Sequence, residues 1–168
     1  MKESEEIFRQ ICASAKDAII MIDNESIISF WNKAAEEIFG HSRENAVGKE
    51  LASLIIPEGL REAYMIGFAK FKDTGHGPVI GKTVRLTAVR RDGAEFPIEL
   101  SLSSVKVQDE WSAVGIIRDI TERNESERRL NAQHAVTRVL SDSSTLKEAS
   151  QNILQAVCEA LNWDFGVV

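Results

Sequence analysis

The side chains that most often carry catalysis are few in this 168-residue chain and lie far apart. The histidines are His41, His76 and His134, and the cysteines are Cys12 and Cys158. None of them has the spacing of a nucleophile with its base, of a zinc site or of a disulfide framework. The glycines form no Gly-x-x-x-x-Gly-Lys-Ser/Thr phosphate loop. The sequence therefore predicts neither enzymatic activity nor a metal site within these residues.

An aspartate and a threonine two residues apart, Asp119 and Thr121, form the polar pair with the clearest role. They follow an apolar, β-branched run over 111–118 and open a highly charged run over 121–131 that favours a helix. At a strand end such side chains can bond each other or nearby backbone groups, and so fix the direction of the departing helix. We expect them to relay a signal from a sheet into that helix. The alternative is a helix N-cap with no signalling role.

A second candidate site is an apolar pocket between the helices and the sheet. Tyr64 and Thr87 are among the few polar groups that could orient a small ligand there. The alternative is that the same apolar side chains simply form the core. The candidate pocket residues are Ile38, Phe39, Leu54, Tyr64, Phe68, Val84, Leu86, Ile98, Leu100, Val114 and Ile116.

The first half of the chain supplies two short strands and several helices to hold these residues. Asn32 is placed to cap a short helix that Gly40 closes. The predicted elements are a helix over 3–16, strands over 18–22 and 26–31, a helix over 32–40, short helical turns over 41–57 and a helix over 58–72.

Three further strands follow, and short connections make them antiparallel neighbours. Asp92-Gly93 predicts a hairpin turn, since this pair supplies the positive φ angles that tight turns need. Apolar residues alternate up to Leu102, and a change of phase at Ser103-Ser104 predicts a bulge before Val105. The economical fold is α+β: a five-stranded antiparallel sheet with helices on one face, covering about residues 17–120.

The chain changes character after residue 120. We expect a cap helix over 1–16, the sheet domain over 17–120 and a signalling or coiled-coil linker helix over 121–143, which has a narrow, Ala-rich apolar stripe. Thr145-x-x-Glu148 is a capping-box pattern that opens another helix, and the last residues look like the start of a strand. We therefore interpret 144–168 as the truncated start of a second domain.

Composition narrows the class of protein. With 43% hydrophobic and 27% charged residues, the chain is typical of a globular protein and not of a disordered one. Its net charge of -6 argues against nucleic acid or an anionic membrane as a partner. Both cysteines lie on apolar helical faces, which is typical of small buried side chains, and we find neither a signal peptide nor a membrane span. These features favour a reducing, cytoplasmic setting; an anchor elsewhere in a longer parent protein stays open.

Three motifs resemble those of PAS domains of the S-box type, as found in bacterial and archaeal sensor proteins. They lie at 31–40 (WNKAAEEIFG), at 90–100 (RRDGAEFPIEL) and at 118–123 (RDITER). Together they place the resemblance over about residues 5–123. Residues 132–164 resemble the linker helix and opening helix of a GAF domain. A PAS domain followed by a GAF domain implies a sensor histidine kinase as the parent protein.

The resemblance also bears on cofactors. Residues 57–100 resemble the haem-binding, oxygen-sensing branch of the family, in which a helical histidine ligates iron and an arginine on the next strand contacts the bound gas. Aligned on Pro57, this chain has Tyr64 at the histidine position and Val84 at the arginine position. Tyrosinate can ligate ferric haem, but the replacements favour a tyrosine packed against the sheet. The covalent flavin chemistry of the light-sensing branch needs a cysteine on the helix after residue 40; none lies between 13 and 157, which excludes it.

The resulting hypothesis is a sensory and dimerisation module that relays a ligand or partner signal from its sheet to its C-terminal helix. Its expected partners are a second copy, bound through the terminal helices, a small-molecule ligand of unknown identity, and the downstream GAF and kinase domains of the parent. The alternative is a ligand-free dimerisation and spacer scaffold for the GAF domain. A haem-based gas sensor is the third possibility.

Overall fold

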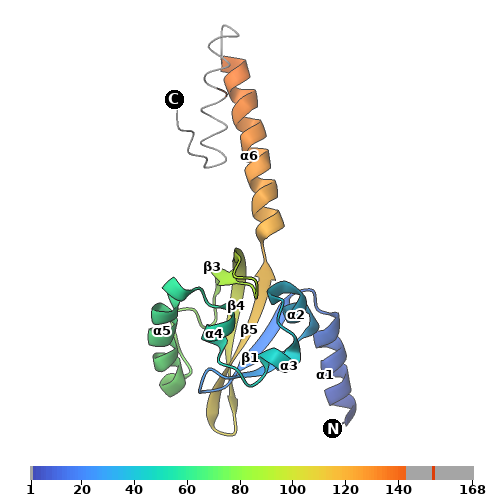
Figure 1. Ribbon diagram of the computed structural model, residues 1–168, viewed down its shortest axis with the longest axis vertical. Helices are drawn as coiled ribbons and strands as arrows, with labels where there is room; N and C mark the ends of the chain where they lie inside the picture. Colours follow the sequence, from blue (N-terminus) through green and yellow to red (C-terminus); the bar gives the residue numbers. More distant parts are fainter. Residues whose placement is uncertain (1, 143–152, 154–168) are drawn as a thin grey trace. The chain divides into compact units, whose positions relative to one another are not determined.

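The computed structural model describes residues 2–142 and residue 153 (Figure 1). The chain divides between Ile120 and Thr121 into two compact units. The predicted start of a GAF domain, at 144–168, falls outside the described residues except for residue 153.

The first unit is built on a five-stranded antiparallel sheet with strand order β2-β1-β5-β4-β3. This confirms the predicted fold class. β5 occupies the central position of the sheet and, as the last strand along the chain, is also the one that leads out of the unit. The strands are β1 (Ala18–Ile22), β2 (Ile28–Trp31), β3 (Thr83–Val89), β4 (Glu95–Val107) and β5 (Glu110–Asp119).

Register assigns each strand residue to one of two faces. Ile20 pairs with Gly115, and Leu100 pairs with Ile117, so these residues share the inner face, which the helices cover. The β4–β5 register is unbroken from Ile98 to Val107, so the predicted bulge at Ser103-Ser104 is wrong. Val105 and Val107 simply lie on the opposite, outer face, where both are exposed. The irregularity that does occur lies in β1 against β2, between Met21 and Ile22.

Helices precede, cover and follow this sheet (Figure 1). Gly40 and Gly75 have positive φ angles of 78° and 67° and end α2 and α5 as left-handed C-caps. The end at Gly40 was predicted. The helix expected over 58–72 begins instead with a 3-10 turn and runs two residues further, to Thr74. The helical elements are α1 (Lys2–Ser14), α2 (Lys33–Phe39), α3 (Arg43–Ala46), α4 (Leu51–Ile55), the 3-10 turn η1 (Glu58–Leu60), α5 (Arg61–Thr74) and α6 (Thr121–Asp142).

Asn32 joins three of these elements through one buried side chain. Its Oδ1 accepts hydrogen bonds from the backbone amides of Ala35 and Ile19, both at 2.9 Å. Its Nδ2 donates to the carbonyls of Cys12 at 3.0 Å and Asp17 at 3.1 Å. The side chain therefore caps α2, as predicted, and also holds the end of α1 and the entry to β1.

The core beneath α2 is aromatic. Phe39 lies between Trp31 and Phe96, with ring centroids 5.5 Å and 5.7 Å away. Trp31, Phe39 and Phe96 are all buried, and Ile120 is buried at the end of the unit. Aromatic pairs at these distances add about 0.5–1.5 kcal/mol each beyond the area they bury.

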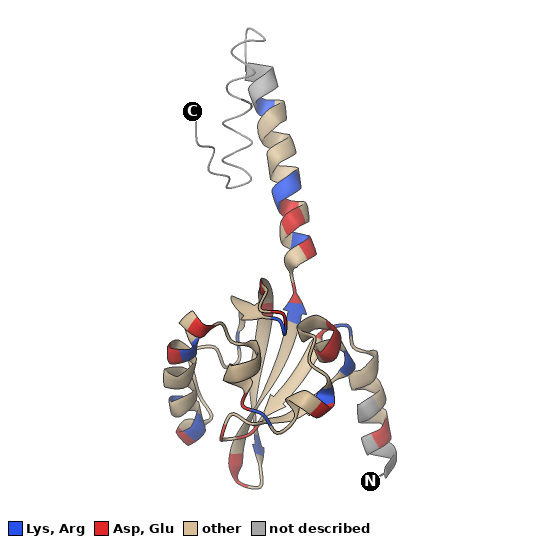
Figure 2. Ribbon diagram, viewed as in Figure 1, with Lys and Arg blue, Asp and Glu red and all other residues tan. Residues whose placement is uncertain are grey.

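The second unit, over the residues that the structure describes, is the polar helix α6. Charges of both signs gather along its first turns (Figure 2), where Arg123 and Glu127 form an ion pair at 3.0 Å. Among residues 2–142, no helix has the length and apolar character needed to cross a membrane.

Candidate functional site

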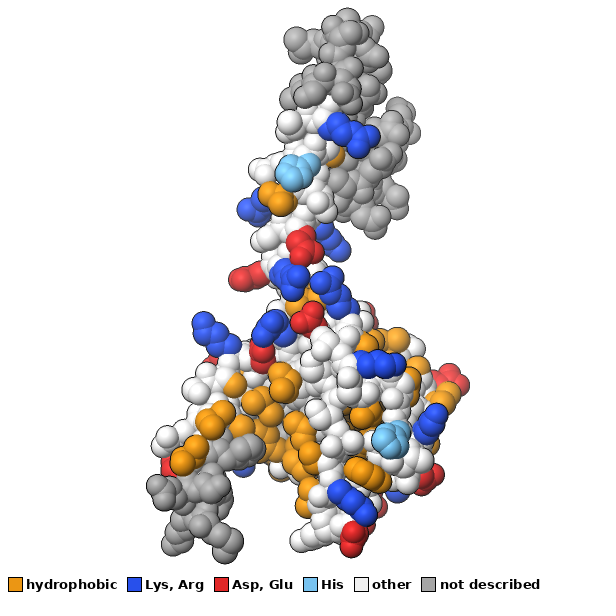
Figure 3. All heavy atoms as spheres, turned by 180° about the vertical axis from the view of Figure 1, so that it is seen from behind, with side chains coloured by type: hydrophobic (Ala, Val, Ile, Leu, Met, Phe, Trp, Pro, Cys, Tyr) orange, Lys and Arg blue, Asp and Glu red, His pale blue; other side chains and the backbone are white. Residues whose placement is uncertain are grey.

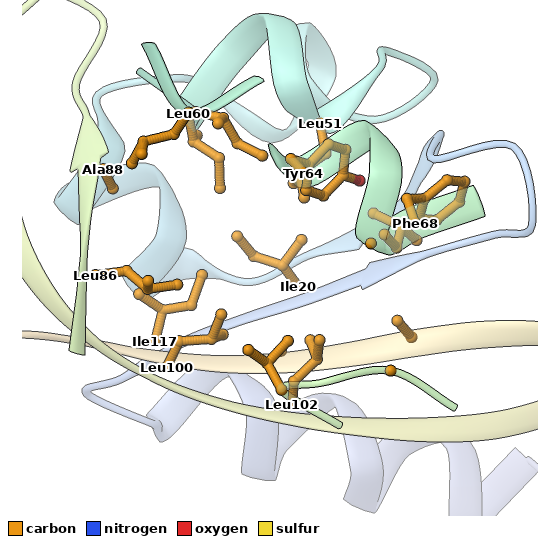
Figure 4. A pocket seen from close by; sticks show the side chains of 18 of the residues that line it. Ile20, Leu51, Leu60, Tyr64, Phe68, Leu86, Ala88, Leu100, Leu102 and Ile117 are labelled. Atoms are coloured by element: carbon orange, nitrogen blue, oxygen red, sulfur yellow. The ribbon is translucent and has the colours of Figure 1, made fainter. Parts of the chain in front are cut away.

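A cavity of about 330 Å³ lies between the inner face of the sheet and the helices α4 and α5. Figure 4 shows side chains from the two layers pointing toward one another: Leu100, Leu102 and Ile117 from the sheet, and Tyr64 and Phe68 from α5. The volume lies in the range of small-molecule sites. The architecture thus leaves room for a small ligand.

The lining is almost entirely apolar. Tyr64 and Thr87 supply its polar side-chain oxygens, and no charged side chain lines the cavity among the residues that the structure describes. The Tyr64 hydroxyl is turned to Ser26 Oγ, 2.5 Å away, in the turn between β1 and β2. Ser26 is 2% exposed and adopts a φ of 66°. This pair connects α5 to the turn between β1 and β2. Because α5 covers the cavity, it is called the lid helix below.

Burial raises the pKa of Tyr64 to about 12, while the Ser26 hydrogen bond opposes the shift and the charge of Glu50 adds to it. The phenol is therefore neutral at physiological pH. Because the folded state holds the phenolic proton more tightly than the unfolded chain does, Tyr64 contributes stability fully below pH 10. That contribution is lost as the pH rises from 10 to about 12.

Tyr64 is the single tyrosine of the chain, so its titration can be read directly from tyrosinate absorbance. We expect an ionisation midpoint well above 10 in the folded protein and a free energy of unfolding that declines above pH 10. In Tyr64→Phe this alkaline decline should be smaller, and stability at neutral pH should fall by about 1 kcal/mol with the loss of the Ser26 bond. A midpoint near 10, or an equally steep decline in the variant, would contradict the assignment.

Five of the eleven predicted pocket residues line this cavity: Tyr64, Phe68, Leu86, Ile98 and Leu100. The six others do not.

The assignment of Val114 and Ile116 to the cavity is corrected by the register. They pair with Ser103 and Ser101 on the outer face, and Ile116 is 46% exposed. The inner-face residues of β5 are instead Ala113, Gly115 and Ile117.

The remaining four predicted residues lie outside the lining for different reasons. Phe39 is in the aromatic core, and Ile38 and Leu54 pack against the core. Val84 is half-buried opposite Leu100 on the edge strand.

Several lining residues were missed by the sequence prediction. Ile20 and Ile22 alternate in β1, and this period-two pattern could have identified them. The segment from Gly77 to Ile80 also lines the cavity, as do Leu51 and Ile55 of α4. Their inclusion depends on loop geometry that no local pattern reveals.

The lining does not fit haem. None of the described lining residues is a histidine, cysteine or methionine, and none carries a positive charge to pair with propionates. Tyr64 remains protonated and bonded to Ser26. A flavin ring edge would likewise find no amide side chain in this lining. No group of three His, Cys, Asp or Glu residues that could hold a metal ion occurs in the described part of the chain.

A polar junction lies where β5 ends. Arg90, just after β3, donates from Nη1 to the carbonyl of Ile38 and from Nη2 to Asp119 Oδ2 at 2.5 Å. Its guanidinium also lies over the ring of Phe96, with Cζ 3.7 Å from the centroid. The sequence prediction singled out Asp119 but not Arg90. One side chain thus joins the end of α2, β4 and the last residue of β5.

Backbone hydrogen bonds reinforce this junction. Ile120 donates to the carbonyl of Pro97 at 3.2 Å, and Arg91 donates to the carbonyl of Phe39 at 2.9 Å. These bonds hold Ile120, the residue between β5 and α6, against β4, and the end of α2 against the β3–β4 turn.

Comparison with known proteins agrees with this architecture. The family model described as the PAS fold matches residues 6–120. The chain is 32% identical over 130 residues to the sensor protein FixL of Bradyrhizobium diazoefficiens, covering 77% of this chain and 26% of FixL. The chain spans about a quarter of the length of FixL and 17% of the length of another curated relative that it matches.

Solved structures show the same fold. The PAS domain of a Colwellia psychrerythraea protein matches with a TM-score of 0.59 and 25% identity, covering 71% of this chain and 98% of that one. A PAS domain from a two-component sensor histidine kinase matches with a TM-score of 0.54 and 18% identity, covering 71% and 99%. Family model, relative and fold agree, and the chain therefore belongs to the PAS family, with its PAS domain at residues 6–120.

Proposed function

We propose that this domain is the sensory module of a signal-transduction protein, with a sensor histidine kinase as the parent. In this proposal a ligand in the cavity, or a partner on the sheet, changes the packing of β5. The change passes through Asp119 and Thr121 into α6 and from there to the output domain.

The observation that carries the proposal is the double role of β5. Ala113, Gly115 and Ile117 line the cavity, and Asp119 of the same strand is held by Arg90. β5 is paired with β4 without a break from Glu110 to Asp119, and in this proposal that continuous ladder carries a displacement at Gly115 to Asp119. FixL, to which the chain is similar, is named a sensor protein.

The test is the double substitution Asp119→Ala, Thr121→Val in the full-length parent. We expect the ratio of stimulated to unstimulated output, measured as autophosphorylation, to fall to about one, because the link between β5 and α6 is cut. The control is Asp109→Asn, which removes an ion pair with Lys106 in the β4–β5 hairpin, away from the junction. An unchanged ratio of stimulated to unstimulated autophosphorylation in the double variant would contradict the proposal.

A second copy of the chain completes the proposal. Ile7 and Ile11 are 52% and 60% exposed on α1, and apolar side chains gather on the outer face of the sheet (Figure 3), including Ile116 and Val107. Such surfaces mark interaction sites in proteins. We expect a homodimer through the terminal helices, with a concentration-dependent mass that Ile7→Glu with Ile11→Glu shifts to the monomer.

The exposed outer face also supports the second candidate, a dimerisation and spacer scaffold without a ligand. The two functions differ in one observable. A sensory module responds to occupancy of the cavity, whereas a scaffold dimerises equally well when the cavity is filled by a larger side chain.

A further inference from the structure

We propose that the cavity takes an uncharged, predominantly hydrocarbon molecule that enters between Leu60 and Leu86. The inference rests on the sensory role proposed above and names the class of ligand. Three observations support it: the charge balance of the lining, a glycine in the middle of α5 and the apolar entrance.

The lining leaves a charged ligand without a partner. A buried carboxylate or ammonium group costs several kcal/mol unless a counter-charge or hydrogen bonds receive it. No charged side chain lines the cavity among the described residues. The negative charge of Glu50 already acts on Tyr64 and raises its pKa, which disfavours an anion further. An uncharged ligand avoids both costs.

The polar oxygens of the lining offer little to a polar ligand. The Tyr64 hydroxyl is already paired with Ser26, and Thr87 lies on the exposed edge strand. One of the two hydroxyl protons of Tyr64 and Ser26 is used in the hydrogen bond between them. The other proton can be donated to one acceptor atom of a ligand. A molecule with many polar groups would lose its bonds to water without replacing them.

Gly67 is the second observation. It lies inside α5 and lines the cavity, although a glycine within a helix costs about 1 kcal/mol relative to alanine. Its φ is not positive, and a Cβ built on it meets nothing within 4 Å. Neither backbone conformation nor close packing therefore requires glycine here. Gly67 lines the cavity, and a side chain added there would have open space to occupy.

The entrance is the third observation. Leu60 and Leu86 both line the cavity, yet each is 42% exposed. Leu60 is the last residue of η1, just before α5, and Leu86 is on the edge strand β3; both lie on the same side of the cavity in Figure 4. Two large apolar side chains open to water beside an apolar cavity form a surface that a hydrocarbon ligand covers favourably.

The size of the cavity sets the probe. A volume of about 330 Å³ corresponds to roughly ten water-sized groups at ~30 Å³ each. Decan-1-ol and decanoate match this size and differ in charge at neutral pH. Both can be titrated into the ¹⁵N-labelled chain, with the amide signals of Gly67 and Gly115, which line the cavity, as the readout.

We expect decanol to shift both glycine signals and to bind at least tenfold more tightly than decanoate. Gly67→Trp, which fills the space under the lid, should weaken decanol binding at least tenfold, while Gly67→Ala should retain it with a raised Tm. Tighter binding of decanoate would overturn the ligand class and leave the sensory role standing. No response of either lining glycine in the unmodified chain would overturn the inference itself. The sensory relay is judged separately, by the Asp119 and Thr121 variant, which needs neither probe.

Discussion

Replacing Asn32 with alanine is expected to lower the free energy of unfolding by about 3 kcal/mol. The asparagine side chain uses its full capacity: two acceptor bonds from Ile19 and Ala35, and two donor bonds to Cys12 and Asp17. Loss of the helix cap costs about 1 kcal/mol. The amide of Ile19 and two carbonyls lose their partners at a site that is 5% exposed, which adds about 1–3 kcal/mol.

Urea denaturation followed by circular dichroism measures this effect. The matched control is Asn45→Ala on the exposed end of α3, where a change within about 0.5 kcal/mol is expected. A loss below 1 kcal/mol for Asn32→Ala would mean that Asn32 does not hold α1, β1 and α2 together.

Gly75→Ala is the second large effect, expected at about 3 kcal/mol. Gly75 ends α5 with a φ of 67°, where a residue with a Cβ is strained by about 1 kcal/mol. The added Cβ would also lie 2.4 Å from two ring carbons of Trp111, so the indole must move. Overpacking of this kind costs about 1–3 kcal/mol.

Two comparisons separate the backbone strain from the clash. Gly81 has a φ of 73° with nothing within 4 Å of its Cβ position, so Gly81→Ala should show the backbone cost alone. In a Trp111→Ala background, Gly75→Ala should cost no more than Gly81→Ala does. Equal costs for Gly75→Ala and Gly81→Ala in the natural background would show that the indole does not pin the end of α5.

Local chemistry made much of the fold predictable. The Gly40 cap and the Asn32 cap depend on residues a few positions apart, and both form as predicted. The hairpin turn at Asp92-Gly93 also forms, with a positive φ at Gly93 but not at Asp92. The three other bonds of Asn32, to Cys12, Asp17 and Ile19, span 20, 15 and 13 residues and leave no local signal.

The site was less predictable, for two physical reasons. In β5 almost every residue from Trp111 to Ile117 is apolar or small, so the pattern cannot tell the inner face from the outer. Bulk favoured Val114 and Ile116, whereas the register with β4 places Gly115 and Ile117 inside. Arg90 was missed because its partners Ile38 and Asp119 are 52 and 29 residues away, and only the folded sheet brings them together.

The central claim is that a ligand in the cavity changes the structure at the end of β5, where the chain leaves the sheet. The amide of Ile120, which donates to Pro97, reports on that point in the same ¹⁵N titration with decanol. The account predicts that the Ile120 signal shifts in step with that of Gly115, and that neither shifts in Gly67→Trp. A shift at Gly115 with an unchanged signal at Ile120 would contradict the account. Decanol would then bind in the cavity without changing the structure at the end of β5.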